Sequence, residues 1–291
     1  MSATTADAAV LRVEAQWNSL TRARRTRTIL FAVLFMLAFA ASVRVGEVSP
    51  LRFIEGIDGL FNYVGRTLPL ATGDGLIADL QEWYWGFFKW LGLIGDTIVI
   101  GFLATVLGTL GGFLLALAAS RNLGAGAVAY FLARRTLEIA RSVPELVYAL
   151  MFVFAFGIGP LAGVLAIAIH TVGALGKLFA EVIENIDEGP REGLRAGGAG
   201  WIQIVRFAVI PQVLPNFLSY ALMRFEINVR GAAIIGFVGA GGIGQELYLV
   251  IRQFIYQDIS AIVLMLMATV MLIDLLSERL RHTLIGREAL R

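Results

Sequence analysis

Residues 91–119 read LGLIGDTIVIGFLATVLGTLGGFLLALAA, a run in which Asp96 is the only charged side chain. A helix needs about 20 apolar residues to cross the roughly 30 Å hydrocarbon core of a bilayer. This run therefore predicts a transmembrane helix. Its glycines and threonines let helices approach closely in lipid, so we expect that face to be buried against another helix.

The whole chain has the composition of a protein whose main solvent is lipid. Of its 291 residues, 58% are hydrophobic and only 16% are charged, and the charges cluster between apolar stretches. The net charge of +2 gives no indication of a nucleic-acid partner. With no cysteine, disulfides and thiolate metal sites are excluded, and the only histidines, His170 and His282, lie in different segments. We therefore expect no metal site on this chain.

The hydropathy pattern predicts an all-α, polytopic membrane protein with six transmembrane helices. We place these helices near residues 28–46, 92–119, 128–157, 160–184, 209–236 and 257–280. They imply a cytoplasmic N-terminal segment at 1–27, a core of five helices at 91–281 with a cytoplasmic loop at 187–207, and a cytoplasmic tail at 282–291. The run near 28–46 lacks a convincing cleavage site, so we expect it to remain as an anchor.

The segment 47–90 is too polar to cross the membrane and is expected to be extracytoplasmic or interfacial. Its aromatic cluster between Trp83 and Trp90 suits an interfacial helix, with a ligand-binding cage as the less favoured alternative.

Arginine placement predicts the orientation, because cytoplasmic loops are enriched in basic residues. With six spans, all of the basic clusters fall on one side and both termini are cytoplasmic. These clusters contain Arg22, Arg24, Arg25, Arg27, Arg121, Arg134, Arg135, Arg191, Arg195, Arg206, Arg279, Arg281, Arg287 and Arg291.

The stretch Glu192-Gly-Leu-Arg-Ala-Gly-Gly198 lies between two expected spans, on the side that the arginines mark as cytoplasmic. Acidic residues near a helix start, opposed by Arg191 and Arg195, favour a short helix along the membrane surface. Glycines that include Gly198 would end this helix. Pro211 would occupy the first turn of the next span, where a missing N–H costs little.

At this point the sequence resembles a known family. Glu192, a glycine six positions later and Pro211 thirteen positions after that glycine look like the EAA loop of ABC-importer permeases, with Gly193 and Leu194 where alanines are usual. Three further segments resemble phosphonate-type permeases, which are relatives of the methionine importer permeases. They are Arg141-Ser-Val-Pro-Glu145, Phe156-Gly-Ile-Gly-Pro160 and Gly239-Ala-Gly-Gly-Ile-Gly-Gln245.

The resemblance implies a type I importer fold in the bacterial inner membrane. It implies a second permease copy, as a homodimer, two ATPase subunits that bind ATP and Mg, and an extracytoplasmic binding protein. The chain itself would be a non-catalytic subunit without a cofactor. Its ATPase-coupling residues would be Glu192, Arg195, Ala196, Gly198 and Pro211.

Within this family the resemblance favours a phosphonate as substrate. Phosphite, phosphate or another small oxyanion is the alternative, followed by methionine-like amino acids. A secondary carrier or a channel is the alternative from another class, although neither needs an EAA-like loop. An intramembrane enzyme would need a reactive constellation, and no such motif is found.

Polar residues inside the expected spans need partners or an aqueous path, because a charge at the bilayer centre costs about 2.5–3.5 kcal/mol. We expect Arg141 and Glu145 to pair along one face of the third span. They either pair between helices and fix the bundle, or line the path and attract an anion weakly. The candidate path residues are Arg141, Glu145, His170, Lys177, Glu181, Glu226, Asn228 and Arg230.

The segment 239–245 is glycine-rich but is not a nucleotide loop, because no strand precedes it and no Lys-Ser/Thr follows it. We expect a flexible turn at the extracytoplasmic gate, formed by Gly239, Gly241, Gly242 and Gly244.

Overall fold

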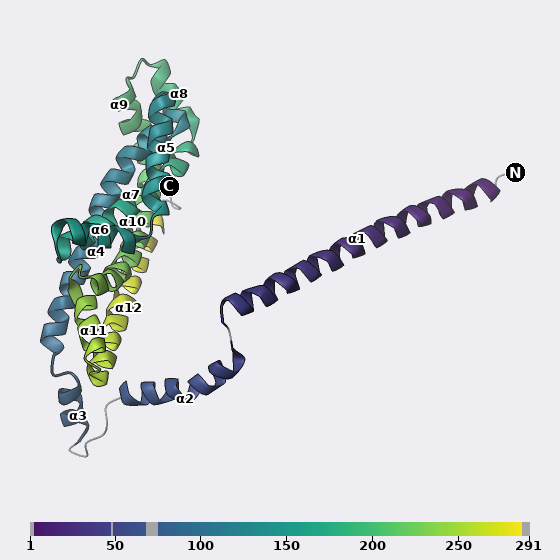
Figure 1. Ribbon diagram of the computed structural model, residues 1–291. Helices are drawn as coiled ribbons and strands as arrows, with labels where there is room; N and C mark the ends of the chain where they lie inside the picture. Colours follow the sequence, from purple (N-terminus) through teal and green to yellow (C-terminus); the bar gives the residue numbers. More distant parts are fainter. Residues whose placement is uncertain (1–2, 48, 68–74, 287–291) are drawn as a thin grey trace. The chain divides into compact units, whose positions relative to one another are not determined.

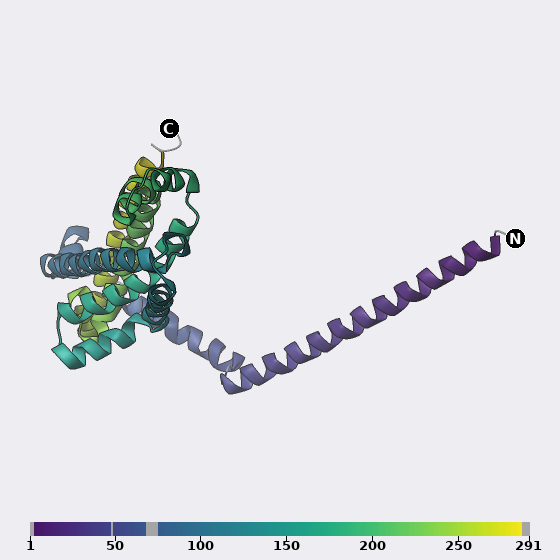
Figure 2. The ribbon, with the colours of Figure 1, turned by 90° about the horizontal axis from the view of Figure 1, so that it is seen from above.

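The computed structural model describes residues 3–47, 49–67 and 75–286, and within these residues it contains helices and turns but no strand. The chain divides into two units, residues 1–65 and 66–291. In the first unit, α1 (Ala3–Val45) is one uninterrupted helix, followed by α2 (Pro50–Thr67) (Figures 1 and 2). The apolar part of α1, Arg24–Val45, is a helix long and apolar enough to be the first predicted span.

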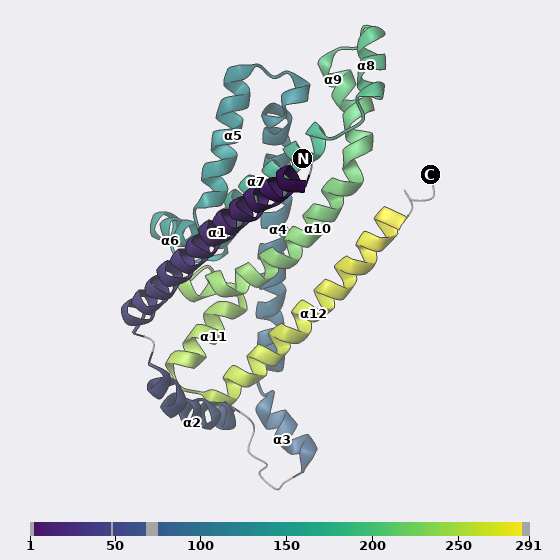
Figure 3. The ribbon, with the colours of Figure 1, turned by 90° about the vertical axis from the view of Figure 1, so that its right-hand side faces the viewer.

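The second unit, called here the core unit, carries the remaining elements. They are α3 (Leu76–Trp83), α4 (Phe87–Ala119), η1 (Arg121–Leu123), α5 (Ala127–Ser142), α6 (Glu145–Phe156), α7 (Pro160–Glu184), α8 (Glu188–Ala196), α9 (Trp201–Ile204), η2 (Val205–Val209), α10 (Ile210–Ile235), η3 (Gly236–Val238), α11 (Gly242–Arg252) and α12 (Tyr256–Gly286). Helices α8 and α9 lie at one end of this unit, the α8 end, and α3 and α11 lie at the other, the α11 end (Figures 1 and 3).

The small residues of α4 pack against α7. A Cβ atom added at Gly112 would lie 3.0 Å from the backbone nitrogen of Gly176, and one added at Gly108 would overlap Thr171. Only glycine allows two helix backbones to come this close. The prediction that the small-residue face of residues 91–119 is buried is confirmed.

The third predicted span is not one straight helix. Helices α5 and α6 meet at an angle of 89°, so that α6 lies across the direction of α5 (Figures 1 and 3). The break falls at Val143 and Pro144, which are both outside the helices. The reason is local, because the residue before a proline is disfavoured in the α region and proline has no N–H to continue a helix.

The fifth predicted span begins earlier than expected. α9, η2, α10 and η3 form one apolar stretch from Trp201 to Val238, about 57 Å long at 1.5 Å per residue. Pro211 is therefore inside a long helix instead of at its start. The π-helical segment η2, closed by a hydrogen bond from the Ile210 N–H to the Val205 carbonyl, directly precedes this proline. Such local changes in hydrogen bonding are one way in which helices accommodate proline.

The aromatic cluster at the α11 end is divided between the protein interior and the surface. Trp83 donates to Ser260 Oγ at 3.0 Å, Trp85 donates to Asp258 Oδ1 at 3.1 Å, and Trp90 is fully buried. Phe88 is 85% exposed. The indole N–H groups of Trp83 and Trp85 thus fix the end of α3 and the turn before α4 to the start of α12, while the outer rings suit a membrane interface.

Candidate functional site

Helix α8 is the helix predicted around Glu192, and its two ends are capped. Asp187 is the N-cap and accepts a hydrogen bond from the Gly189 N–H at 3.1 Å. At the other end, Ala199 N–H donates to the Leu194 carbonyl and Gly198 N–H donates to the Arg195 carbonyl, both at 3.0 Å. This pair of bonds is a Schellman motif, which places its C′ residue in the left-handed region.

Gly198 is the C′ residue and has a φ of +80°. A residue with a Cβ atom is disfavoured there by about 1–2 kcal/mol. The glycine six positions after Glu192 is therefore required by the way in which α8 ends.

Two sets of contacts fix α8 to the core unit. On one side, Asp187 N–H donates to Gln212 Oε1 at 3.0 Å, and Gln212 Nε2 donates to the Asp187 carbonyl at 3.3 Å. On the other side, Arg191 donates to the Asn122 carbonyl. These contacts could not be predicted from the sequence, because they join segments far apart in the chain. They attach α8 to both α10 and η1.

The predicted coupling residues separate into two groups. Glu192, Arg195 and Ala196 are exposed on α8, and within the described residues Glu192 and Arg195 form no ion pair. Pro211 is exposed on α10, outside α8. The exposed face of α8 is free to contact another chain.

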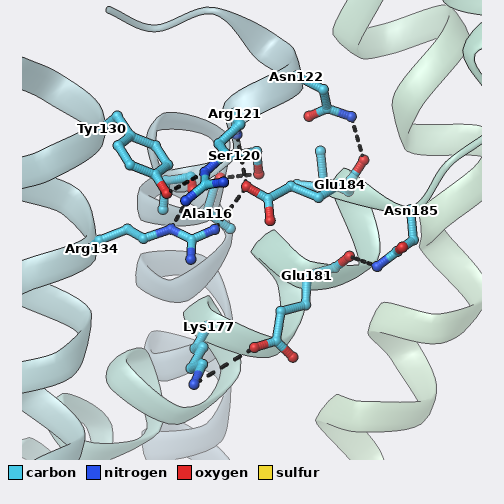
Figure 4. Close-up of polar contacts among 12 residues, drawn as sticks. Ala116, Ser120, Arg121, Asn122, Tyr130, Arg134, Lys177, Glu181, Glu184 and Asn185 are labelled. Carbon is cyan, nitrogen blue, oxygen red and sulfur yellow. Dashed lines mark hydrogen bonds and ion pairs between the residues drawn. The ribbon is translucent and has the colours of Figure 1, made fainter. Parts of the chain in front are cut away.

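A polar cluster ties α4, α5 and α7 together near η1 (Figure 4). Glu184 accepts from Arg134 at 2.7 Å and from the Arg121 backbone N–H at 2.9 Å. Arg121 donates to the Tyr130 hydroxyl at 2.8 Å, and this bond raises the pKa of the Arg121 guanidinium above its ordinary value. Arg121 therefore remains charged. Farther along α7, Lys177 lies 3.7 Å from Glu181.

A second cluster joins α6, α7 and α10. Glu145 Oε1 lies 2.7 Å from Arg224 Nη2 and 2.7 Å from His170 Nδ1. The predicted pair of Arg141 and Glu145 is wrong, because Glu145 pairs with Arg224 and His170 and, among the described residues, Arg141 forms no ion pair. Arg224, which the path prediction omitted, is the partner of Glu145. Only its position near Asn228 in the sequence could have suggested it.

The remaining path residues pair between helices. Asn228 is fully buried and donates to Thr105 Oγ1 at 2.8 Å. Glu226 accepts from Arg281 at 3.3 Å, and Arg230 lies 3.5 Å from Asp274. These contacts join α10 to α4 and α12. Each of these three residues therefore has a partner on another helix.

Two cavities follow one face of α7. The first has a volume of about 360 Å³ and is lined by Arg141, His170, Ala174, Lys177, Leu178 and Glu181. The second has a volume of about 420 Å³ and is lined by Leu178, Glu181, Val182, Asn185, Ile186, Asp187, Gln212, Asn216 and Tyr220. Leu178 and Glu181 border both. The two cavities are therefore neighbours along α7, one lined by His170 and the other by Asp187, the N-cap of α8.

The glycines of the predicted gate form a buried, closely packed turn and not an open flexible one. Gly241 and Gly242 have φ of +82° and +72°, and Gly239 accepts through its carbonyl from the Gly159 N–H at 2.9 Å. Ile243 N–H donates to Thr97 Oγ1 at 2.9 Å. The absence of Cβ atoms lets this turn press against neighbouring backbone. Two of the motif segments, 156–160 and 239–245, therefore meet at the α11 end.

Comparisons with known proteins agree with this architecture. The family model of the binding-protein-dependent transport system inner membrane component matches residues 108–287. A phosphite transport system permease protein of Stutzerimonas stutzeri is 36% identical over 250 residues, which are 86% of each chain. A phosphate-import permease protein of Mycolicibacterium smegmatis is 34% identical over 81% of this chain, which spans only 42% of that longer protein.

Solved structures show the same fold. A chain of the MetNI methionine ABC transporter, in inward-facing conformations, has a TM-score of 0.59 at 23% identity and matches over 68% of this chain and 97% of its own. A bacterial ABC transporter involved in the import of alginate has a TM-score of 0.59 at 12% identity, over 89% of this chain and 96% of its own. The chain has the type I ABC-importer permease fold, and it belongs to the family of inner membrane components of binding-protein-dependent transport systems.

Proposed function

We propose that this permease carries a small phosphorus oxyanion across the inner membrane, a phosphonate first, with phosphite or phosphate as the alternatives. The relatives that support this class are a phosphite permease and a phosphate-import permease. Methionine-like amino acids are less favoured, because the methionine transporter resembles this chain in fold at lower identity.

The observation that carries the proposal is the charge of the cavity along α7. Arg141, His170 and Lys177 line it, against a single carboxylate, Glu181. Lys177 and Glu181 lie 3.7 Å apart and are both partly exposed, so their attraction is weak. The cavity is therefore suited to an anion. Its attraction has to remain weak, since a site that holds the anion tightly within the membrane would trap it.

The proposal extends to the partners of the chain. In this proposal two copies of the chain form the path, and α8 of each copy docks on an ATPase subunit that binds ATP and Mg. The α8 end and both termini face the cytoplasm, and the α11 end faces the binding protein. Because Gln212 and Arg191 fix α8 to α10 and η1, movement of the ATPase would move these helices as one body.

The test is ATP hydrolysis by the complete transporter in lipid nanodiscs. Its binding protein is added with methylphosphonate, phosphite, phosphate or methionine in turn. Stimulation by one or more of the phosphorus oxyanions, and not by methionine, is the expected result. Stimulation by methionine alone would overturn the proposed substrate class. If none of the four ligands stimulates hydrolysis, the proposal that this permease imports a phosphorus oxyanion is overturned.

Coupling through α8 is tested by Glu192→Lys. We expect the variant to be inserted in the membrane in normal amounts, but to lose roughly tenfold or more of its ligand-stimulated hydrolysis, because a reversed charge faces the docking surface of the ATPase. Glu192→Gln, which only removes the charge, should lie between this variant and the wild type. Normal transport by Glu192→Lys would show that this face of α8 does not contact the ATPase.

A further inference from the structure

The cluster of Glu145, His170 and Arg224 has an unusual arrangement of donors and acceptors. One carboxylate oxygen, Glu145 Oε1, lies 2.7 Å from Arg224 Nη2 and 2.7 Å from His170 Nδ1. The two nitrogens are themselves only 2.6 Å apart. The three side chains come from α10, α6 and α7, and they are 12–20% exposed. The cluster is therefore largely enclosed, but His170 also lines the cavity along α7, which gives access to the cluster.

These contacts cannot all be hydrogen bonds at the same time. His170 Nδ1 either carries a proton and donates to Glu145, or accepts from Arg224. In addition, Arg224 uses only one terminal nitrogen on the carboxylate, and its Nε is 3.4 Å from Thr171 Oγ1. Guanidinium groups bind oxyanions best through two parallel hydrogen bonds. Glu145 thus leaves part of the hydrogen-bonding capacity of these donors unused.

We propose that Glu145 is an internal substitute for the transported oxyanion, which displaces its carboxylate from Arg224 and His170 during passage. This inference rests on the proposed function and names the residues that bind the substrate within the membrane. A tetrahedral phosphorus oxyanion presents several oxygens, so one can accept from Arg224 while another accepts from His170. Each of the two donors then has an acceptor oxygen of its own, instead of sharing Oε1.

The position of Glu145 allows it to leave. It is the first residue of α6, directly after the 89° break at Val143 and Pro144. A rotation of α6 about this break would withdraw the carboxylate from α7 and α10. Arg141 lines the same cavity as His170 and has no ion pair among the described residues, so it is a cation available to the displaced carboxylate.

Exchange of one anion for another also explains how such a site can be weak. Arg224 keeps a counter-ion before, during and after passage, and an unpaired charge at this depth would be costly. The substrate gains only the difference between its own hydrogen bonds and those of Glu145. That difference is small, as rapid release to the cytoplasm requires.

The first experiment compares Glu145→Gln with the wild type in the full transporter complex. We expect millimolar phosphite, phosphate or methylphosphonate to raise the Tm of Glu145→Gln, and to bind it about tenfold more tightly than the wild type, because the competing carboxylate is gone. Transport should fall. Glu138→Gln, which removes a carboxylate of α5 that pairs with Arg135 outside the cluster, is the matched control and should respond like the wild type.

The second experiment uses the double variant Glu145→Gln/Arg224→Gln, which keeps the cluster neutral. If the pair only holds the helices together, restored neutrality should restore transport, and that result would overturn the proposal. We expect instead that the double variant assembles but neither transports nor shows the oxyanion-dependent rise in Tm.

Two outcomes separate this inference from the proposed function. Stimulation of the wild-type complex by a phosphorus oxyanion, with no difference in anion response between Glu145→Gln and Glu138→Gln, would overturn the role of Glu145 alone. A wild-type complex that none of the three oxyanions stimulates would overturn the proposed function, and the inference with it.

Discussion

The two ends of the core unit are held together by different forces. At the α8 end, polar side chains such as Gln212, Arg191 and Glu184 bind backbone groups and one another at 2.7–3.0 Å or closer. At the α11 end, polar contacts such as Lys89 with Glu246 at 2.6 Å are also present, but glycine backbone presses on backbone between residues 236 and 244, a segment that contains no charged residue. A hydrogen bond at a surface contributes little to stability, and water can replace its partner, whereas close backbone packing tolerates almost no added atom. The α8 end should therefore adjust to mutation, and the α11 end should not.

The largest effect is expected for Gly244→Ala. A Cβ atom at this position would overlap the Ala233 carbonyl, which is backbone and cannot rotate away. We expect a loss of about 3 kcal/mol of stability and a marked fall in the Tm of the purified protein. Gly95→Ala is the control, because nothing lies within 4 Å of its Cβ position. If the two variants have the same Tm, the proposed contrast between the two ends is wrong.

The next effect is expected at Gly198, where the left-handed conformation can be tested by a pair of substitutions. Gly198→Val should weaken the end of α8 by about 1–2 kcal/mol, and Gly198→Asn by less, because asparagine tolerates this conformation. The measured quantity is the ratio of ligand-stimulated to basal ATP hydrolysis. Equal ratios for the two variants would mean that the end of α8 is not under this constraint.

A smaller effect is expected for Gln212→Ala, which removes the hydrogen bonds between Asp187 and α10. Each such bond contributes about 1 kcal/mol. The protein should fold, while the amide hydrogens of α8 exchange faster with solvent than in the wild type. Asn216→Ala, one turn farther along α10, is the control. Unchanged exchange in Gln212→Ala would show that α8 is held from the η1 side.

The smallest effect is expected for Glu184→Gln. Its ion pair with Arg134 is about one-quarter exposed on each side, so its contribution to stability is about 1 kcal/mol or less. The difference in Tm between the variant and the wild type should shrink further at high salt. A difference that exceeds that of Gly244→Ala would reverse the comparison between the two ends.

The sequence was sufficient to predict the long apolar helices and α8, but α2 and α11 were not predicted, and the start of α11 was expected to be a flexible turn. Long apolar runs are a local property, and so are the charges and glycines that delimit α8. The break at Pro144 was also visible in the sequence, but a continuous hydropathy signal from 128 to 157 outweighed one proline. Pro211 led to the opposite error, a helix start predicted where the helix continues. A proline that suits a helix start can also follow a π-helical turn inside a helix.

The partners of the polar residues could not be predicted from spacing. Glu145 pairs with residues 25 and 79 positions away, and Glu226 pairs with one 55 positions away. Spacing of four along a helix indicates only that two side chains share a face. Whether they bind each other depends on what the neighbouring helices present, and in this chain arginines of other helices compete successfully. The same limit explains why Arg224, although it lies close to Asn228 in the sequence, was not among the candidate path residues.

The π-helical segment Val205–Val209 sets the rotational phase between the two parts of the long helix that contains it. A regular α-helix turns by about 100° per residue. Removing one residue from this segment would restore regular α-helix and rotate Trp201 by about that angle around the axis, away from the Leu123 carbonyl to which it now donates at 3.1 Å. The single extra residue thus keeps the exposed face of α8 and the polar face of α10 in register with their different neighbours.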